Sequence, residues 1–309
     1  MASGVIVSVG ELLVEIMRED KGTPLSVPGT FRGPYASGAP AIFAWAAARL
    51  GAPVRFAGVC GDDPFGAMCR QHLQDAGVDL FVRTDPIHET GAAFVSYKGD
   101  GDREFLFYLQ HAAAAQLSPA DVTPELLVGI GWLHVTGSSL GVSESVRQAV
   151  FVAVERAKAQ GATVSFDPNV RPELFPGQNL AEVCRPVLDA ADVILPSLTE
   201  AEQLTGIADA EAACRALLAG TRTVLLKRGA AGCTLYSDGQ VQHVPGLPTH
   251  EVDPTGAGDA FAAGFAVASL RGAGALEAAR FANVVGALSI AAFGPTSAPL
   301  SYDRVKAYV

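Results

Sequence analysis

Apolar, β-branched runs alternate along the chain with segments whose apolar residues recur every three or four positions. The runs are typical of buried strands, and the second kind of segment is typical of helices packed on a sheet. This alternation predicts parallel strands joined by crossover helices, which is an α/β fold. The predicted strands are residues 5–9, 54–59, 132–136, 163–167, 193–195 and 223–227. The predicted helices are residues 39–50, 65–76, 143–160, 180–190, 210–219, 257–270, 275–292 and 302–308.

Two segments interrupt this alternation, residues 12–35 and residues 91–109. The first contains several glycines and prolines. The second alternates in polarity up to a Gly-Asp-Gly turn at residues 99–101, and a further apolar run follows. Alternation followed by such a turn predicts a hairpin. We expect the two segments to form a small separate β-sheet, a lid over the ends of the main strands. Tyr97, Phe107 and Tyr108 are expected to pack within the hairpin.

Composition narrows the functional class. The 309 residues are 49% hydrophobic, enough for a large core and a single domain over residues 1–309. Lys+Arg of 22 against Asp+Glu of 32 gives a net charge of −10, which argues against nucleic acid or an anionic membrane as a partner. The five cysteines are widely spaced without a zinc-type cluster, so we expect a reduced, cytoplasmic protein. The alanine-rich tracts 41–50 and 261–270 are too short to span a bilayer.

Residues 253–264 carry the most informative chemistry. Gly256, Ala257 and Gly258 leave backbone N–H groups unobstructed where a long helix is predicted to begin, and such a helix N-terminus binds anions. Asp259 falls in the first turn, where the helix dipole favours an ionised carboxylate. A carboxylate beside an anion site can accept a proton from a hydroxyl, which suits phosphoryl transfer to an alcohol. A tight turn that merely starts a helix is the structural alternative.

The stretch Asp-Pro-Thr-Gly-Ala-Gly-Asp at residues 253–259 resembles the second signature of the ribokinase-like (PfkB) carbohydrate kinase family. Further segments resemble other motifs of the family and occur in its order, so the resemblance covers essentially the whole chain. They are residues 37–44, 48–51, 58–66, 167–171, 196–202 and 226–232. The resemblance implies a ribokinase-like α/β fold, with a central mostly parallel sheet flanked by helices and a small β-sheet lid. It also implies an ATP-dependent sugar kinase.

The resemblance implies site residues position by position. Asp259 would be the catalytic base, with the amides of Gly256, Ala257 and Gly258 as the anion hole for the transferred phosphoryl group. The residues implied to bind the sugar are Glu15, Gly38, Arg171 and Asp259. The residues implied to bind the nucleotide are Ser197, Lys227, Gly229, Gly232, Gly258 and Asn283.

ATP and Mg²⁺ are the implied cofactors. Glu200 would organise Mg²⁺ through water, because this ion keeps much of its hydration shell. A monovalent cation such as K⁺ is implied near Asp253 and residues 294–297.

Several of these residues have a structural alternative. Arg171 could cap the carbonyl end of a strand, and Glu200 could be an early-turn helix carboxylate stabilised by the dipole. Glu11 and Glu15 lie four residues apart and could both be solvated. Their position beside the carboxyl end of the first strand nevertheless favours a site.

Departures from the family pattern bear on the substrate. Ser37 and Ile42 replace a Gly and an Asn of the first signature, Ser197 replaces an Asn, and no Arg follows Tyr108. The missing Arg removes one partner for an acid substrate. The first signature favours a ketohexose, fructose or tagatose, whereas residues 167–171 fit 2-keto-3-deoxygluconate kinases equally well. A nucleoside is a more distant alternative.

Two alternatives come from other classes. A sugar- or nucleotide-binding regulator without turnover would have no need of Asp259 beside an anion hole. A dinucleotide-dependent oxidoreductase would need Gly-x-Gly-x-x-Gly directly after the first strand, which residues 10–12 do not supply. The expected partners are therefore a small sugar and ATP, together with a second copy of the chain, because an exposed lid sheet can pair across a two-fold axis.

Overall fold

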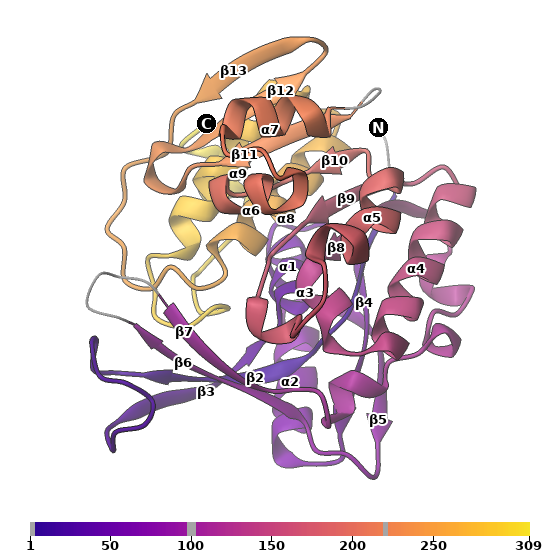
Figure 1. Ribbon diagram of the computed structural model, residues 1–309, viewed down its shortest axis with the longest axis vertical. Helices are drawn as coiled ribbons and strands as arrows, with labels where there is room; N and C mark the ends of the chain where they lie inside the picture. The colour runs from indigo at the N-terminus through magenta and orange to yellow at the C-terminus, as the bar shows by residue number, and fades with distance from the viewer. Residues whose placement is uncertain (1–3, 98–102, 219–221) are drawn as a thin grey trace.

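A computed structural model describes residues 4–97, 103–218 and 222–309. Its larger sheet has nine strands in the order β13-β12-β11-β10-β9-β8-β1-β4-β5 (Figure 1). From β11 to β5 neighbouring strands pair in parallel, whereas the pairs β11–β12 and β12–β13 are antiparallel. The strands are β1 (Val5–Val9), β4 (Val54–Gly61), β5 (Val78–Asp85), β8 (Ile130–Thr136), β9 (Thr163–Asp167), β10 (Val193–Ile194), β11 (Thr223–Lys227), β12 (Cys233–Ser237) and β13 (Gln240–Val244). All six strands predicted for this sheet are present.

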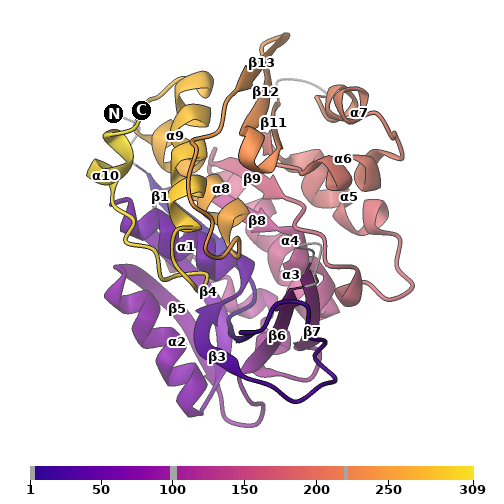
Figure 2. The ribbon, with the colours of Figure 1, turned by 90° about the vertical axis from the view of Figure 1, so that its left-hand side faces the viewer.

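Helices cover both faces of the sheet (Figure 2). Those predicted from the sequence are present, and α3 and α6 are additional. No helix in the described ranges has the length and apolar character needed to cross a membrane. The helices are α1 (Ala39–Arg49), α2 (Pro64–Asp75), α3 (Gly137–Val142), α4 (Glu144–Ala159), α5 (Leu180–Ala190), α6 (Leu198–Thr205), α7 (Ala210–Leu217), α8 (Ala257–Leu270), α9 (Ala275–Ser289) and α10 (Tyr302–Lys306).

Successive residues of each central strand enter opposite hydrophobic cores. Ile6 packs in a core with side chains of α1, α8 and α9, whereas its neighbour Val7 packs with side chains of α4 and α5. In the same way, Trp132 packs in the first core and its neighbour Leu133 packs in the second. A sheet that is buried on both faces requires apolar residues at consecutive positions. This requirement explains why the strands are recognisable as continuous apolar runs in the sequence.

The second sheet is a four-stranded lid in the order β3-β2-β6-β7. Its two central strands, β2 and β6, come from the two predicted lid segments and pair in parallel. The outer strands β3 and β7 pair antiparallel with them. The predicted turn at residues 99–101 lies outside the described residues. The lid strands are β2 (Leu13–Arg18), β3 (Phe31–Ser37), β6 (Gly91–Tyr97) and β7 (Arg103–Tyr108).

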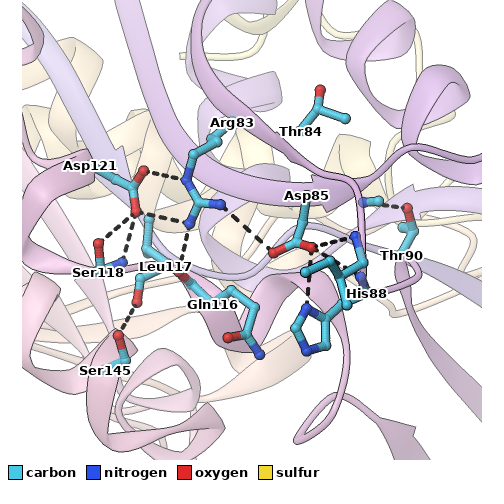
Figure 3. A network of polar contacts seen from close by, with 12 residues as sticks. Arg83, Thr84, Asp85, His88, Thr90, Gln116, Leu117, Ser118, Asp121 and Ser145 are labelled. Carbon is cyan, nitrogen blue, oxygen red and sulfur yellow. Dashed lines mark hydrogen bonds and ion pairs between the residues drawn. The ribbon is translucent and has the colours of Figure 1, made fainter.

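Polar contacts fix the base of the lid, where β6 and β7 connect to the main sheet (Figure 3). Arg83, near the end of β5, donates from Nε to Asp121 Oδ1 at 2.7 Å, in a turn that follows β7. Asp85 accepts the N–H groups of Ile87 and His88 at 2.8 and 2.9 Å, which shapes the connection into β6. These backbone bonds lower the pKa of Asp85 to about 2. These contacts hold the connection from β5 to β6 and the segment after β7 against the main sheet.

Gly264 lies where α8 packs on α9. A Cβ at this position would lie 2.9 Å from Val285 Cγ2 and 3.0 Å from Ala282 Cα, closer than side chains normally approach. We expect Gly264→Val to lower the free energy of unfolding by about 2–3 kcal/mol, because overpacking a core is destabilising. Chemical denaturation measures the change. Gly274→Ser is the control, since no atom lies within 4 Å of a Cβ there and serine caps a helix well. Equal losses in the two variants would contradict this account.

Candidate active site

Helix α8 begins inside the molecule at a left-handed glycine. Gly256 has a φ of 79° and supplies no side-chain cap, and a Cβ there would lie 3.0 Å from Ile42 Cγ2. The Ala257 N–H lies 3.3 Å from the Pro254 carbonyl oxygen. Within the described ranges, the amides of Gly256 and Gly258 have no backbone acceptor. Unpaired amides at a helix N-terminus form an anion site.

Asp259 follows in the first turn of α8 and is 6% exposed. Asn169, in the loop after β9, donates from Nδ2 to Asp259 Oδ1 at 3.0 Å. Burial and the nearby Asp167 raise the pKa of Asp259 to about 8, although the charges of Lys227 and Arg171 oppose this rise. The carboxyl group therefore exchanges its proton close to neutral pH, as a general base must.

Two cavities open beside this helix start. The lid cavity lies against the lid, and its lining includes every residue that we expected to bind the sugar: Glu15, Gly38, Arg171 and Asp259. The glycine cavity lies against β11 and α9, and its lining includes five of the six residues expected to bind the nucleotide: Lys227, Gly229, Gly232, Gly258 and Asn283. Its empty volume is about 1010 Å³, against about 510 Å³ for the lid cavity. Gly256 lines the first cavity and Gly258 the second, so the anion site lies between them.

Charged groups gather on the lid side of the lid cavity. Ser37 Oγ donates to Glu15 Oε2 at 2.6 Å. Burial raises the pKa of Glu15 to about 7, despite this bond and the nearby charges of Arg103 and Arg171. The guanidinium carbon of Arg171 lies 5.1 Å from the centroid of the Phe105 ring, and that of Arg103 lies 5.7 Å from it. Acidic, cationic and aromatic groups thus converge on the cavity and can bind a polar ligand from several directions.

Glu11 is a second buried acid at the lid cavity. Its Oε1 accepts Ser138 Oγ at 2.8 Å, and its Oε2 accepts Ser139 Oγ at 2.5 Å. Burial raises the pKa of Glu11 above its usual value in spite of both bonds. Both Glu11 and Glu15 are buried, so the alternative that they are solvated surface residues is wrong. Glu11 ties the end of β1 to the start of α3 and forms part of the cavity floor.

Lys227 joins the acidic groups beside the helix start. Its Nζ lies 2.5 Å from Asp167 Oδ2 and 3.9 Å from Glu200 Oε2. A Cβ at Gly258 would lie 3.4 Å from the same Nζ, so the ammonium group faces the anion site. Although burial opposes its charge, the two acids raise the pKa of Lys227 above its usual value. Lys227 therefore remains positively charged next to the amides.

Ser197 and Glu200 lie behind the cavity walls, at the start of α6. The Ser197 N–H donates to Glu200 Oε2 at 2.7 Å, and the Glu200 N–H donates to Ser197 Oγ at 3.4 Å, which makes a capping box. Glu200 Oε1 accepts the Val170 N–H at 3.1 Å. Burial opposes ionisation, yet Lys227 and these bonds hold the pKa of Glu200 below its usual value. Glu200 thus makes the contacts of a carboxylate in the first turn of a helix, which was the structural alternative for this residue. Neither Ser197 nor Glu200 lines the lid cavity or the glycine cavity.

Asn283 and Gly232 shape the glycine cavity. Asn283 Nδ2 donates to the carbonyl oxygens of Val244 and Pro245 at 3.0 and 3.1 Å. Gly232 has a φ of 92°, and a Cβ there would lie 2.2 Å from the Val244 carbonyl oxygen. Both residues hold the chain after β13 against the cavity wall.

Sequence reasoning missed three residues of this site. Asn169, which donates to Asp259, and Asp167, which pairs with Lys227, belong to the recognised segment 167–171 but had no role assigned to them. The position of Glu11 favoured a site, but no role was assigned to this residue. The signal that was available for all three is their position just after a buried parallel strand or at its end, where ligands bind in α/β sheets.

Phosphoryl transfer is the chemistry that an anion site beside a buried carboxylate serves. The chain matches the model of the pfkB family carbohydrate kinases over residues 5–301, and it belongs to that family. It is 36% identical over 299 residues to Fructokinase-1 of Oryza sativa subsp. japonica, which covers 93% of this chain and 92% of that protein. It is also 36% identical over 266 residues to the fructokinase of Klebsiella pneumoniae, covering 85% and 83% respectively.

Solved structures show the same architecture. A putative ribokinase II from E. coli, in complex with ATP and Mg²⁺, has a TM-score of 0.91 at 37% identity, covering 99% of this chain and 98% of that one. The fructokinase from Vibrio cholerae O395, with fructose, ADP and calcium bound, has a TM-score of 0.86 at 28% identity, covering 100% and 99%. The expected ribokinase-like fold is confirmed, and the protein is a carbohydrate kinase that phosphorylates a sugar hydroxyl.

The pairing of Lys227 with Asp167 predicts a pH-dependent loss of stability in Lys227→Met. Burial already raises the pKa of Asp167 above its usual value, and the charge of Lys227 opposes this rise. Without the ammonium group the pKa of Asp167 rises further in the folded state, whereas in the unfolded chain this carboxyl group ionises at about pH 4. The folded variant then binds more protons, so its free energy of unfolding relative to wild type should fall by about 2 kcal/mol between about pH 5 and about pH 8. Denaturation at several pH values measures this difference.

Lys158→Met is the matched control for that experiment. Lys158 Nζ contacts Asp192 Oδ1 at 2.8 Å on the surface, where ion pairs contribute little to stability. We expect its free energy of unfolding to follow that of wild type across the pH range. The same pH dependence in both variants would show that the Lys227–Asp167 pair is not responsible.

Proposed function

We propose that the protein is an ATP-dependent ketohexose kinase, which transfers the γ-phosphoryl group of ATP to a hydroxyl of fructose or tagatose. The observation that carries the proposal is the position of Asp259 and the unpaired amides between a smaller polar cavity and a larger glycine-lined one. The relatives named fructokinase and the neighbour with bound fructose support a ketohexose as the acceptor.

In this proposal each substrate occupies one cavity. ATP binds in the glycine cavity, with its γ-phosphoryl group at the amides of residues 256–258 and beside the charged Nζ of Lys227. The sugar binds in the lid cavity, where Glu15 and Arg171 contact its hydroxyls and Gly38 allows its close approach. Ionised Asp259 accepts the proton of the attacking hydroxyl as the new O–P bond forms in line and the bond to the leaving ADP oxygen breaks. The lid excludes water from this step.

The acidic groups around Lys227 fit a role for Mg²⁺. Asp167, Glu200 and Asp259 outnumber this single ammonium group, and both oxygens of Glu200 already accept backbone N–H groups. We therefore assign Glu200 to holding Mg²⁺ through water rather than directly. When bound, Mg²⁺ supplies positive charge to the phosphate oxygens.

A monovalent cation near Asp253 belongs to the same proposal. The Asp253 carboxylate accepts the Thr255 N–H at 3.0 Å and the Gly294 N–H at 2.8 Å, so it ties the loop before α8 to residues 294–297. These bonds suit K⁺ binding at the backbone of the joined loops, with Asp253 ordering them. A Vibrio cholerae fructokinase variant was solved with fructose, ADP and potassium bound, which supports this choice of ion.

A 2-keto-3-deoxygluconate kinase is the second candidate. Arg103 and Arg171 both line the lid cavity, which favours an acceptor with a carboxylate. Leu109, the residue directly after Tyr108, also lines this cavity and offers no charge to an acid. A regulator without turnover is disfavoured, since a binding protein has no use for a base such as Asp259 next to an anion site.

Coupled ATP turnover with Mg²⁺ tests these assignments. The acceptors are fructose, tagatose, 2-keto-3-deoxygluconate, ribose and adenosine, and we expect a ketohexose to give the highest kcat/KM. Asp259→Asn should lower kcat by about 10²–10⁴-fold, because it removes the base. Tight ATP binding without turnover on any acceptor would contradict the kinase mechanism and favour the regulator.

The raised pKa of Asp259 predicts the pH profile. A base must be ionised, and burial raises the pKa of Asp259 to about 8. We therefore expect kcat/KM to rise about tenfold per pH unit below pH 8 and to level off above it. Glu15→Gln removes another acid of the lid cavity whose pKa is raised, to about 7. This variant should bind the sugar more weakly, yet its kcat/KM should still rise up to about pH 8. If kcat/KM no longer rose with pH in Glu15→Gln, the group that titrates in wild type would be Glu15 and not Asp259.

A homodimer through the lid and a cytoplasmic location complete the proposal. The Phe94 ring lies edge-to-face with both Phe31 and Tyr108, at centroid distances of 6.0 Å, so one aromatic row crosses the lid. Tyr108 is 60% exposed and neighbouring Leu106 is 44% exposed, and exposed apolar faces of this kind mark association sites. The five cysteines are buried free thiols, as expected in a reducing compartment.

Light scattering coupled to size exclusion tests the dimer. We expect wild type at twice the monomer mass and Leu106→Glu at the monomer mass, because the new charge would be buried at the interface. Val128→Glu changes an apolar residue away from the lid that is 61% exposed, more than Leu106, and it should remain dimeric. A monomeric wild type, or a monomeric Val128→Glu, would contradict association through the lid.

A further inference from the structure

The hydroxyl of Tyr97 connects the lid to the loop that starts α8. Tyr97 ends strand β6, and its hydroxyl donates to Asp253 Oδ1 at 2.5 Å. The same hydroxyl lies 3.1 Å from Thr255 Oγ1. In addition to the expected packing within the hairpin, the hydroxyl of Tyr97 therefore reaches from the lid to the loop before α8.

The partners of Tyr97 directly precede the anion site. Asp253 is 1% exposed, and its carboxylate also accepts the N–H groups of Thr255 and Gly294. Thr255 is followed by Gly256, whose amide is unpaired. Burial and the Asp253 carboxylate raise the pKa of Tyr97, so its hydroxyl keeps its proton and donates it at neutral pH. A change at this hydroxyl is thus transmitted to the anion site through Asp253 and Thr255.

A second lid strand, β3, also contacts the loop of residues 293–297. The Thr296 hydroxyl donates to the Ala36 carbonyl oxygen at 3.2 Å. A Cβ at Gly294 would lie 2.6 Å from Tyr35 Cε1, and the Tyr35 and Phe293 ring centroids are 6.1 Å apart. In the described part of the chain the Tyr35 hydroxyl has no hydrogen-bond partner. Both loops beside α8 therefore touch the lid, and the hydroxyl of Tyr97 supplies a directional bond at this contact.

Tyr97 is absent from the lining of both cavities, so in the proposed arrangement its hydroxyl would touch neither the sugar nor the nucleotide. Yet it bonds residues that must stay fixed for the amides to point at a phosphoryl group. A side chain with these two properties affects the reaction only by orienting other groups.

We propose that Tyr97 is a positioning residue that couples the lid to the anion site. Its hydrogen bond to Asp253 holds residues 253–256 in the conformation that presents the unpaired amides, and it holds the lid over the lid cavity at the same time. The anion site is then fully ordered only when the lid excludes water, which directs the phosphoryl group to the sugar. This inference rests on the proposed function of the two cavities.

Tyr97→Phe tests the coupling because it removes only the hydroxyl. We expect kcat for sugar phosphorylation to fall about tenfold, as the loss of one charge-assisted hydrogen bond allows. The sugar KM should change by less than about twofold, since the hydroxyl does not touch the sugar. The fraction of ATP that is hydrolysed without sugar phosphorylation should rise, because the hydrogen bond that ties β6 to the loop before α8 is lost. Parallel assays of ADP and of sugar phosphate measure this fraction.

Two comparisons separate positioning from a role in folding. Tyr35→Phe removes a lid hydroxyl that lacks a hydrogen-bond partner among the described residues, so its kcat and hydrolysed fraction should match wild type. A purely structural role of Tyr97 would lower the melting temperature and leave the hydrolysed fraction unchanged. Should Tyr97→Phe fail to fold, Thr255→Val and Thr255→Ser replace it, and only the valine variant should raise the hydrolysed fraction.

The outcomes distinguish this inference from the proposed function. A wild type that phosphorylates none of the sugars defeats the proposed function itself. An active wild type together with an unchanged kcat and hydrolysed fraction in Tyr97→Phe overturns the coupling alone. A raised hydrolysed fraction in Tyr35→Phe would also overturn it, since the effect would not depend on the bond to Asp253.

Discussion

The rest of the structure depends on a helix that begins inside the protein with its amides unpaired. Because Gly256 and Gly258 are only partly buried and line the two cavities, a ligand in either cavity can accept hydrogen bonds from these amides. The surroundings are arranged for this purpose. A left-handed glycine removes the side chain that would otherwise fill the site, and Asp253 orders the residues before it through bonds to two loops. The two cavities meet at this point.

Two acids that share Lys227 as a neighbour have opposite pKa shifts, although burial disfavours the ionised form of both. Glu200 receives two backbone N–H bonds and lies near the ammonium group, so its pKa stays low and it remains ionised. Asp259 receives one bond, from the side chain of Asn169, and its pKa rises. At Glu200 the charge of Lys227 and the backbone donors outweigh burial, whereas at Asp259 the charge of Asp167 adds to the effect of burial. This difference decides which acid is a fixed charge and which can take up a proton.

Sequence patterns predicted those parts of the fold in which a single physical requirement acts along the whole element. Strands buried on both faces and helices with a continuous apolar stripe belong to this group. Strand β5 was missed because it is largely exposed at the sheet edge, and α6 because it is short. The site residues grouped as predicted because parallel strands end at one edge. The pattern Ser-x-x-Glu at residues 197–200 is typical both of a helix capping box and of the family motif. The sequence alone could not decide between these two interpretations.

The bond between Tyr97 and Asp253 was beyond such reasoning, since the residues are 156 positions apart and neither periodicity nor turn chemistry relates them. Strand geometry nevertheless sets its direction. Side chains alternate along β6, so Tyr97 faces the same way as Ala93, which lines the lid cavity, while Phe94 faces outward in the aromatic row. In the proposed dimer, one face of this short strand would lie at the interface, while the other face holds the Tyr97 hydroxyl at Asp253. Contacts on the outer face of the lid would then also hold Tyr97 in place, which would link the proposed dimer to the geometry of the active site.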